Sequence, residues 1–481
     1  LTNYFLPKFL KRSLDPEKKI SQYIKSKNFD LCFARTYNVV KYNIENNTLF
    51  FQKYKNIFPQ NVKNEIRETL TFFNSFFIKD KKNFIFKKTD KINLKSNTFN
   101  KDLSIFTNSN LIFNGPRAYF ASNNDRLFVV TGTGILMSER LELLNLDKEK
   151  ITFEKIKTNL DKFLFEYKKK NPDKFFTSTV KSILILNEDI YISLITKSRG
   201  SSNIINKSNN CFRHEILKGK LNLKKIKFQP FFKINDCRPV YHDYVGGTLS
   251  NYKNDKILYT VGDFAVCEHP SFISKNNFSY CEENNSQVMK SYLGKILEIN
   301  INNGSSNIIS LGHDNPQGLY YDKINNLIIS TEHGPQGGDE INLNISPSKD
   351  NIKNYGYPIA SYGEHYGFPD KSVNYLYRLA PLHKSHIKFG FVEPVKYFVP
   401  SIGISPIDKY KNKIFVGSLG NDVDEGDLSI HTFEIDSKFQ FNNHEIFKVY
   451  NRVRDIHVIN SIKKIFFFFE TTGSIAIIDM N

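Results

Sequence analysis

The chain has 481 residues, of which 40% are hydrophobic and 24% are charged, a balance that indicates a folded globular protein. No stretch reaches the run of about 18 apolar residues that a membrane-spanning helix requires, and the apolar run around Phe466 has only the length of a strand. The formal net charge is +18, but the lysines are spread along the whole chain without a nucleic-acid-binding motif, so we expect no nucleic-acid partner.

Residues 1–108 carry no recognisable repeat. This segment opens with Leu1 and lacks a signal-sequence pattern, and a short helix is predicted after Asp15, ahead of several Phe-rich stretches with interspersed Lys. We therefore expect residues 1–108 to be an N-terminal extension or a small extra domain, and the sequence assigns no role to it.

From about residue 110 onward, one pattern recurs in six copies: a polar turn rich in Asn, Asp or Lys, followed by a short β-type run. The six runs start near Leu127, Ile190, Ile257, Leu327, Ile414 and Ile465. Units of this size must stack around an axis to bury both faces, so we predict an all-β, six-bladed β-propeller over residues 109–481. A pair of β-sandwiches is the alternative, and it explains the recurring units less well.

The chain contains five cysteines, and none belongs to a CxxC pair, so we do not expect a structural zinc site. Cys267 and Cys281 flank a polar stretch, and an oxidising compartment would allow them to form a disulfide. Free thiols at these two positions fit the sequence equally well.

An unusual window follows the fourth run, where Gly and Pro force an irregular turn and two acids come next. Gly334 and Pro335 open the turn, and Asp339 and Glu340 close it. Backbone carbonyls and carboxylates are the ligands that Ca²⁺ prefers, so the window predicts a calcium site. A Gly-rich connection between blades, with two solvated acids, is the alternative that the residues alone leave open.

Three segments in this region, "GHDNPQGL", "STEHGPQGGDEINL" and "NYGYPIASYGEHYG", resemble the glucose/sorbosone dehydrogenase family in order and spacing. The resemblance is dense between Gly312 and Gly367 and extends, more weakly, over about residues 110–480. It implies a six-bladed propeller that oxidises an aldose sugar with pyrroloquinoline quinone (PQQ) and Ca²⁺. It also implies a periplasmic or cell-envelope location, and it leaves the electron acceptor unnamed.

The resemblance further implies two calcium sites. The first Ca²⁺ joins PQQ to two consecutive backbone carbonyls, which match Gly334 and Pro335. The second uses an Asp-Glu pair and a Tyr carbonyl, which match Asp339, Glu340 and Tyr355. A larger set of residues matches positions that contact PQQ in the family: Asn315, Gln317, Arg452 and Arg454. For the two arginines, a solvated basic turn is the alternative interpretation.

The chain departs from the family at the catalytic base. The family has a His two residues before a Gly-Gly pair, and here Tyr244 occupies that position while His242 lies two residues earlier. We expect His242 to act as the base, with Tyr244 as the alternative. Asp314 stands where the family has an Arg, and we expect its carboxylate to turn away from the cofactor or to pair with a cation.

Two functions therefore follow from the sequence. The first is a PQQ- and calcium-dependent sugar dehydrogenase that transfers hydride from the anomeric carbon to the quinone. The second is a propeller that has lost this chemistry and binds a carbohydrate or a protein partner on the same face. The sugar, the electron acceptor and the oligomeric state are not specified by the sequence.

Overall fold

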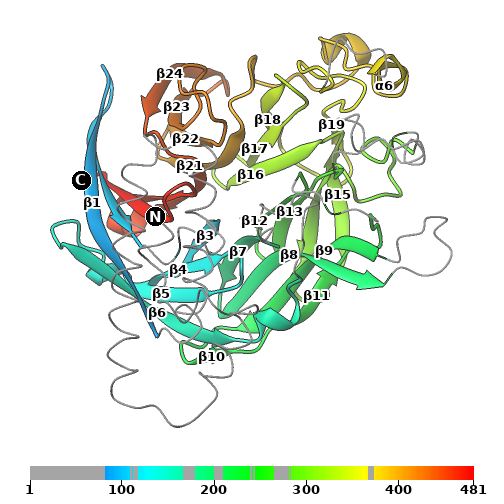
Figure 1. Cartoon of the computed structure of the whole chain (residues 1–481). Coiled ribbons are helices and arrows are strands. Elements are labelled where there is room, and N and C mark those ends of the chain that lie inside the picture. The colour runs from blue at the N-terminus through cyan, green and yellow to red at the C-terminus, as the bar shows by residue number, and fades with distance from the viewer. Residues whose placement is uncertain are drawn as a thin grey trace, which may run out of the picture. The chain divides into compact units, whose positions relative to one another are not determined.

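The computed structural model describes residues 82–108, 111, 117–165, 179–199, 210–238, 241, 244–264, 281, 283–366 and 373–481. The chain divides into two compact units, Leu1–Phe77 and Ile78–Asn481, and all described residues belong to the second. Strands dominate this unit, and the predicted all-β propeller class is confirmed (Figure 1). Among the described residues, no helix has the length and apolar character needed to cross a membrane.

The described strands form five sheets, one of which has ten strands and runs continuously from β25 to β3. We divide the ten-stranded sheet at β1 and name the resulting six antiparallel groups of four strands blades 1 to 6. Blade 1 consists of β3 (Ala118–Ser122), β4 (Arg126–Thr131), β5 (Leu136–Arg140) and β6 (Lys150–Thr158). Blade 2 consists of β7 (Val180–Leu186), β8 (Asp189–Arg199), β9 (Asn210–Lys220) and β11 (Gln229–Lys233). Blade 3 consists of β12 (Gly246–Tyr252), β13 (Lys256–Val261), β14 (Lys295–Asn300) and β15 (Ser306–Leu311).

Blade 4 consists of β16 (Asn315–Asp322), β17 (Leu327–His333), β18 (Asp339–Ile345) and β20 (Lys396–Phe398). Blade 5 consists of β21 (Ile404–Tyr410), β22 (Lys413–Ser418), β23 (Ser429–Ile435) and β24 (Phe441–Lys448). Blade 6 consists of β25 (Val453–Ile459), β26 (Lys464–Phe469), β27 (Ser474–Asp479) and β2 (Asn100–Thr107). The remaining elements are β1 (Asn83–Lys95), β10 (Lys225–Ile226), β19 (Lys353–Asn354), α6 (Val373–Leu379) and the 3-10 helices Leu141–Leu143, Leu160–Lys162, Ile387–Phe389 and Asn460–Ile462.

Every sequence repeat corresponds to the same strand of its blade. The six predicted runs form β4, β8, β13, β17, β22 and β26, which are the second strands of the six groups. In several blades the turn before this strand contains a residue with positive φ, such as Asn187 at 56° and Asn326 at 46°. Asn tolerates this left-handed conformation better than most residues, which accounts for the Asn-rich turns in the sequence.

The hydrophobic core is divided into clusters that lie between neighbouring blades. In β26, Phe466 and Phe468 pack between blades 6 and 1, whereas Phe467 and Phe469 pack between blades 5 and 6. Successive strand residues point to opposite faces, and both faces of this strand are buried. The run "IFFFF" is therefore apolar throughout, and full burial of one such ring contributes about 1.5–3 kcal/mol to stability.

The innermost strands surround a common axis. The first strands of the six blades contact one another in a closed cycle, β3–β7–β12–β16–β21–β25 and back to β3. Residues from all six line one cavity of about 190 Å³. Two of them are acids: burial raises the pKa of Asp408 to about 7 and that of Asp455 to about 8.

Hydrogen bonds near the axis tie neighbouring blades together from blade 3 through blades 4, 5 and 6 to blade 1. The bonds run from Thr248 Oγ1 to Gln317 O (2.6 Å), from Thr331 Oγ1 to Ser405 O (2.7 Å), from Ser405 Oγ to Val453 O (2.6 Å), from Val458 N to Asp408 Oδ2 (2.7 Å) and from Phe120 N to Asp455 Oδ2 (2.6 Å). Short polar side chains thus fix the rotation of one blade against its neighbour.

The N-terminal end of this unit closes the ring. Strand β2 pairs antiparallel with β27, and β1 pairs with both β2 and β6, so these two strands join blade 6 to blade 1. The division at Phe77/Ile78 therefore precedes the expected boundary at residue 108. The sequence repeat does not reveal β1 and β2, because both strands precede its first copy and complete blades 6 and 1 from a distant part of the chain.

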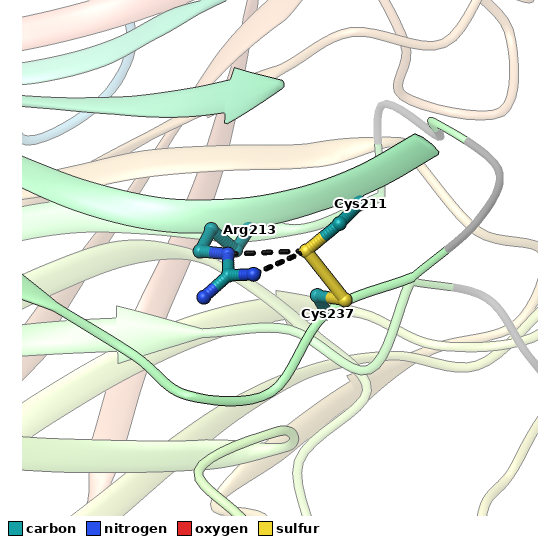
Figure 2. Close-up of a disulfide and its surroundings, with 3 residues drawn as sticks. All are labelled: Cys211, Arg213 and Cys237. Carbon is teal, nitrogen blue, oxygen red and sulfur yellow. Dashed lines mark hydrogen bonds between the residues drawn. A yellow bond between two sulfur atoms is a disulfide. The ribbon is translucent and has the colours of Figure 1, made fainter. Parts of the chain in front are cut away.

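A disulfide joins Cys211, near the start of β9, to Cys237, in the segment after β11 (Figure 2). The Arg213 guanidinium points at the Cys211 sulfur, with Nε 3.1 Å and Nη2 2.5 Å from Sγ. The sequence did not predict this pair. Cys281 is also disulfide-bonded, while Cys267 lies outside the described residues, so the expected Cys267–Cys281 pairing stays a prediction.

Candidate functional site

The polar residues singled out in the sequence gather at one end of the axis. We name this end the top face and define it by the first residues of the six innermost strands: Ala118, Val180, Gly246, Asn315, Ile404 and Val453. The second strand of each blade runs antiparallel to the first and ends at the same face, as the pairing of Asn315 with His333 shows. Residues that precede a first strand or follow a second strand therefore meet there.

Three arginines share one carboxylate at the top face. Arg454 Nε lies 2.5 Å and Arg117 Nε lies 3.8 Å from the same oxygen of Glu470, and Arg452 Nε lies 3.6 Å from the other. Arg452 also donates to the Leu419 carbonyl. Both arginines that were predicted to bind the cofactor are thus held at the top face, where Arg454 is buried and Arg452 keeps 29% of its side-chain surface exposed, and their role in binding stays a prediction.

This cluster controls the protonation of its neighbours. Burial alone would raise the pKa of Glu470, but the charges of Arg454, Arg117 and Arg452 lower it to about 2. Burial and the same three charges lower the pKa of His333 to about 3. At neutral pH, Glu470 is therefore an anion and His333 is a neutral imidazole, which can donate one hydrogen bond and accept another.

Tyr244, the alternative base, faces this cluster. Its ring lies edge-on to the His333 ring with 6.2 Å between centroids, and its charge contributes to the pKa of Arg452. His242, the expected base, lies outside the described residues, so its assignment stays a prediction. The described part of the site therefore combines a phenol, a neutral imidazole and guanidinium groups.

Asn315 and Gln317 lie at the start of β16, at the top face, and their predicted contact with the cofactor stays a prediction. Asn315 Oδ1 accepts hydrogen bonds from the Gly246 amide (2.9 Å) and from Gln317 Nε2 (2.7 Å). Asn315 is buried, and its hydrogen bond to the Gly246 amide connects the Gly-Gly segment of blade 3 to blade 4. It also pairs across the sheet with His333, which places its backbone beside the cluster.

The Gly334–Gly338 turn leads from β17 to β18. The Pro335 carbonyl accepts the Gly338 amide at 2.9 Å, and a Cβ at Gly334 would lie 2.0 Å from the Gly338 carbonyl, so only Gly fits there. No described backbone amide donates to the Gly334 carbonyl. This oxygen suits a hard cation such as Ca²⁺, while the Pro335 carbonyl would contribute its second lone pair.

The residues expected to form the second calcium site are not brought together. Asp339 and Glu340 are consecutive in β18 and therefore point to opposite faces of the sheet. Asp339 Oδ2 accepts the Ile404 amide at 2.7 Å, toward blade 5. Glu340 Oε1 lies 3.2 Å from His386 Nε2, and His386 Nδ1 lies 2.8 Å from the Tyr355 carbonyl oxygen.

His386 thus stands between two of the three ligands expected for that cation. Its side chain is buried, and although burial opposes a charge on the ring, the Glu340 carboxylate outweighs this and raises the pKa of His386. An imidazolium donates from both nitrogens, which matches two oxygen partners. Among the described residues, no group of three or more His, Cys, Asp or Glu side chains is arranged to hold a metal ion. The set Asp339, Glu340 and Tyr355 does not fit the expected ion.

Asp314, which stands where the family has an Arg, is buried beside the top face. Its backbone carbonyl accepts the Asp263 amide at 2.9 Å, which fixes the segment between β15 and β16. The expectation that its carboxylate turns away from the cofactor or pairs with a cation stays a prediction.

Sequence reasoning missed Arg117 and Glu470. Glu470 directly follows the sixth repeat run, just as Glu332 and His333 end the fourth, so its position in the repeat was the available signal. Arg117 precedes the first innermost strand, as Arg452 precedes the last. A comparison of equivalent repeat positions would have identified both residues.

The sequence profile of the Glucose / Sorbosone dehydrogenase family matches residues 187–475, which is more than half of the chain. A segment of 120 residues is 37% identical to the aldose sugar dehydrogenase YliI of Escherichia coli and covers 23% of this chain and 29% of that protein. A segment of 145 residues is 31% identical to quinoprotein glucose dehydrogenase B of Acinetobacter calcoaceticus and covers 27% of this chain and 29% of that protein.

An uncharacterized protein of Synechocystis sp. is 26% identical over 254 residues, which are 48% of this chain and 55% of that protein. The chain therefore matches at most about half of the length of these relatives.

Solved structures show the same fold. A glucose dehydrogenase crystal structure superposes with a TM-score of 0.53 at 16% identity, over 76% of this chain and 96% of that one. The apo form of the soluble aldose sugar dehydrogenase of Escherichia coli gives a TM-score of 0.52 at 17% identity, over 75% and 95% of the two chains. The profile match shows that the chain belongs to the glucose/sorbosone dehydrogenase family.

Proposed function

We propose that this protein is a PQQ- and Ca²⁺-dependent dehydrogenase that oxidises an aldose sugar at its anomeric carbon. Family membership supports the sugar dehydrogenase class. The observation that carries the proposal is the cluster of Arg452, Arg454 and Arg117 at the top face, beside Tyr244 and His333. PQQ is a tricarboxylate, and guanidinium forks are the donors best suited to carboxylates.

The residues of this chain would have separate roles in cofactor binding, cation binding and proton transfer. Arg452 and Arg454 would bind cofactor carboxylates, and the Gly334 and Pro335 carbonyls would hold the single cation that the described residues fit. Bound PQQ would supply a quinone that accepts two electrons as hydride from the sugar. The base, His242 or Tyr244, would take the proton from the anomeric hydroxyl, and buried His333 would stay neutral beside it.

The test is a titration of the purified protein with PQQ, with and without Ca²⁺, followed by an aldose panel with an artificial electron-acceptor dye. We expect saturable PQQ binding that Ca²⁺ strengthens, and dye reduction with at least one aldose. If the wild type binds no PQQ at millimolar Ca²⁺, the proposal fails, and a non-catalytic propeller that binds a carbohydrate or protein on this face takes its place.

The base is identified by a pair of substitutions. His242→Ala should lower turnover by about 10²- to 10⁴-fold, the usual share of general-base catalysis, with little change in PQQ affinity. Tyr244→Phe removes only a hydroxyl and should leave turnover within a few-fold of the wild type. The reverse pattern would transfer the role of base to Tyr244. Single-turnover rates with preloaded PQQ measure both variants.

We also propose that the protein works in the periplasm or cell envelope, as the family resemblance implies. The disulfide between Cys211 and Cys237 supports this, because such bonds persist mainly in oxidising compartments. Thiol labelling of fractionated cells tests the proposal: recovery of the protein in the cytosol with both thiols labelled would contradict it.

A further inference from the structure

The two candidate bases belong to one segment that leads from the outer edge of blade 2 to the axis. This segment comprises residues 234–245, and we name it the base segment. It leaves β11, the edge strand of blade 2, and enters β12, the innermost strand of blade 3. Tyr244 stands near its end, and His242 belongs to it by sequence. Its described residues lie outside the strands, so a few backbone and side-chain contacts fix its position.

The disulfide attaches the beginning of the base segment to blade 2. It joins Cys237 to Cys211, which lies at the top-face end of β9 (Figure 2). Next to this bond, the Phe212 amide donates to the Arg238 carbonyl at 2.8 Å, and the Arg238 amide donates to the Phe212 carbonyl at 2.9 Å. The rings of Tyr241 and Phe212 lie 5.7 Å apart. The disulfide is thus the covalent member of a small group of contacts that hold this part of the segment on a strand.

The end of the base segment is attached to blades 3 and 4. The Val245 carbonyl accepts the Gly262 amide at 2.7 Å, and the Gly246 amide donates to Asn315 Oδ1 at 2.9 Å. Tyr244 and the sequence position of His242 fall between this attachment and the one at Cys237. Loss of the disulfide would therefore give this part of the chain more freedom relative to the axis.

The two sulfur atoms of the disulfide have different surroundings. Cys211 is fully buried, and Arg213 Nε and Nη2 lie 3.1 Å and 2.5 Å from its sulfur (Figure 2). Cys237 is partly exposed. A neighbouring guanidinium favours a thiolate over a thiol, and a sulfur that forms the more stable thiolate is the better leaving group. These surroundings direct an external thiolate to Cys237 and make Cys211 the leaving group.

We propose that the Cys211–Cys237 disulfide is a positioning bond for the catalytic base, and that exchange with a dithiol opens it. The effect on turnover rests on the proposed function, whereas the exchange and the loosening of the base segment do not depend on it. Cys211, Cys237 and Arg213 act here as positioning residues, because they act on the reaction through the base segment.

The exchange takes two steps. One thiolate of the dithiol attacks Cys237 Sγ, the bond between the two cysteines breaks, and Cys211 keeps the electron pair as a thiolate beside Arg213. The second sulfur of the dithiol loses its proton and attacks the mixed disulfide, which releases Cys237 as a thiolate that takes up a proton. The dithiol is oxidised to a disulfide by two electrons, the protein disulfide is reduced by the same two, and one proton passes to the solvent.

The exchange is tested with mixtures of reduced and oxidised dithiothreitol, followed by alkylation and mass spectrometry of the cysteine peptides. Arg213→Gln should lower the equilibrium constant for reduction by about 10-fold, because the Cys211 thiolate loses a charge-assisted hydrogen bond. Arg140→Gln, which removes an exposed arginine on β5, should match the wild type. Glutathione, a monothiol, should be trapped on Cys237. Equal constants in Arg213→Gln and the wild type, or glutathione trapped on Cys211, would overturn the assigned direction of exchange.

Hydrogen exchange of backbone amides follows the base segment without any cofactor. Reduction of the full chain should raise the exchange rates several-fold in peptides from residues 236–245 and leave peptides from β22 and β23 in blade 5 unchanged. The double variant Cys211→Ser/Cys237→Ser should show the faster rates before dithiothreitol is added and should not respond to it. A response in the double variant would assign the effect to the disulfide of Cys281 and overturn the inference.

Turnover is measured after dithiothreitol has been removed by gel filtration and the protein has been loaded with PQQ and Ca²⁺. Reduction should lower kcat by about 10- to 100-fold, because a displaced base fails in the transition state. The KM for the sugar and the PQQ affinity should stay within a few-fold, and reoxidation should restore kcat. The double variant should have the low kcat throughout.

The two readouts separate a failure of this inference from a failure of the proposed function. If the wild type oxidises no sugar, the proposed function fails and hydrogen exchange decides: faster exchange in the base segment on reduction supports the positioning bond, and unchanged exchange overturns it. If the oxidised wild type is active and the reduced protein keeps the same kcat, the proposed function stands and the positioning role is overturned.

Discussion

Glu470 is a carboxylate on which three guanidinium groups converge, and its ionisation is linked to the stability of the fold. Its pKa of about 2 lies below the usual value of a Glu, so the folded state favours the anion. The contribution to stability is present above about pH 4.5 and is lost as the pH falls through about 2. Acid therefore weakens the top face by protonating this one residue.

Glu470→Gln should lower the free energy of unfolding at pH 7 by about 3 kcal/mol, because three like charges lose their shared anion. Its stability should also fall less steeply than that of the wild type between about pH 4.5 and 3. Urea unfolding over this range measures both effects. The control is Glu142→Gln, whose carboxylate is 70% exposed beside Arg140, and it should change stability by less than about 0.5 kcal/mol. Equal losses in the two variants would contradict a special role for Glu470.

The position of His386 between Glu340 and the Tyr355 carbonyl leads to a prediction about cation binding. Its ring separates Glu340 from the Tyr355 carbonyl, so His386→Ala should open a place for a cation between these oxygens. We expect the variant to bind one more Ca²⁺ than the wild type and to be stabilised by it. Isothermal titration of both ligand-free proteins gives the stoichiometry. A wild type that already binds the same number of ions would show that the ring does not block this position.

At the scale of an element, the innermost strands carry buried acids that accept amides from the next blade. Asp455 accepts the Phe120 amide at 2.6 Å, and burial raises its pKa to about 8. A raised pKa means that the folded state favours the protonated acid. The resulting stability is present at low pH and is lost as the pH rises through about 8.

Asp455→Asn should remove much of the loss of stability at alkaline pH. The Asn side-chain carbonyl still accepts the Phe120 amide, but the side chain cannot ionise. We expect the wild type to lose on the order of a few kcal/mol between about pH 6 and 9, and the variant distinctly less. Thermal unfolding at several pH values measures the slope. Asp147→Asn, an exposed control, should follow the wild type, and a variant slope equal to the wild-type slope would rule out Asp455 as the cause.

The sequence revealed the second strand of each blade because that strand is buried on both faces and follows a turn with a special conformation. Both properties leave a local pattern of apolar runs after Asn-rich turns, as around Asn326. Arg452 and Arg454 were found through their neighbours in the motif. Glu470 was not, because its role arises from residues far away in the chain, and His386 was missed because only the folded structure brings it to Glu340.

At the scale of the whole molecule, β1 and β2 are part of the ring rather than of an appendage. Leu103 and Phe106 in β2 are fully buried against blades 5 and 6 and blades 6 and 1 respectively. Without these strands, the edges of β6 and β27 would be unpaired, which favours aggregation.

Two truncated chains test this arrangement. A chain that begins at residue 82 keeps all strands of the ring and should unfold cooperatively, with a Tm close to that of residues 78–481. A chain that begins at residue 109 lacks β1 and β2 and should aggregate or unfold at least about 10 °C lower. Circular dichroism and size-exclusion chromatography compare them. Equal melting of the two chains would show that ring closure contributes little.

Ring closure also has a consequence for the order of folding. Thr107 of β2 bonds to Ser474 of β27 across a sequence separation of 367 residues. At translation rates of roughly 5–20 residues per second, β2 waits roughly 20–70 s on the ribosome before its partner is made. During this interval its edge is open to other chains, and closure of so long a loop is intrinsically slow. Production of the protein should therefore depend on chaperones that shield the early strands until the C-terminus emerges.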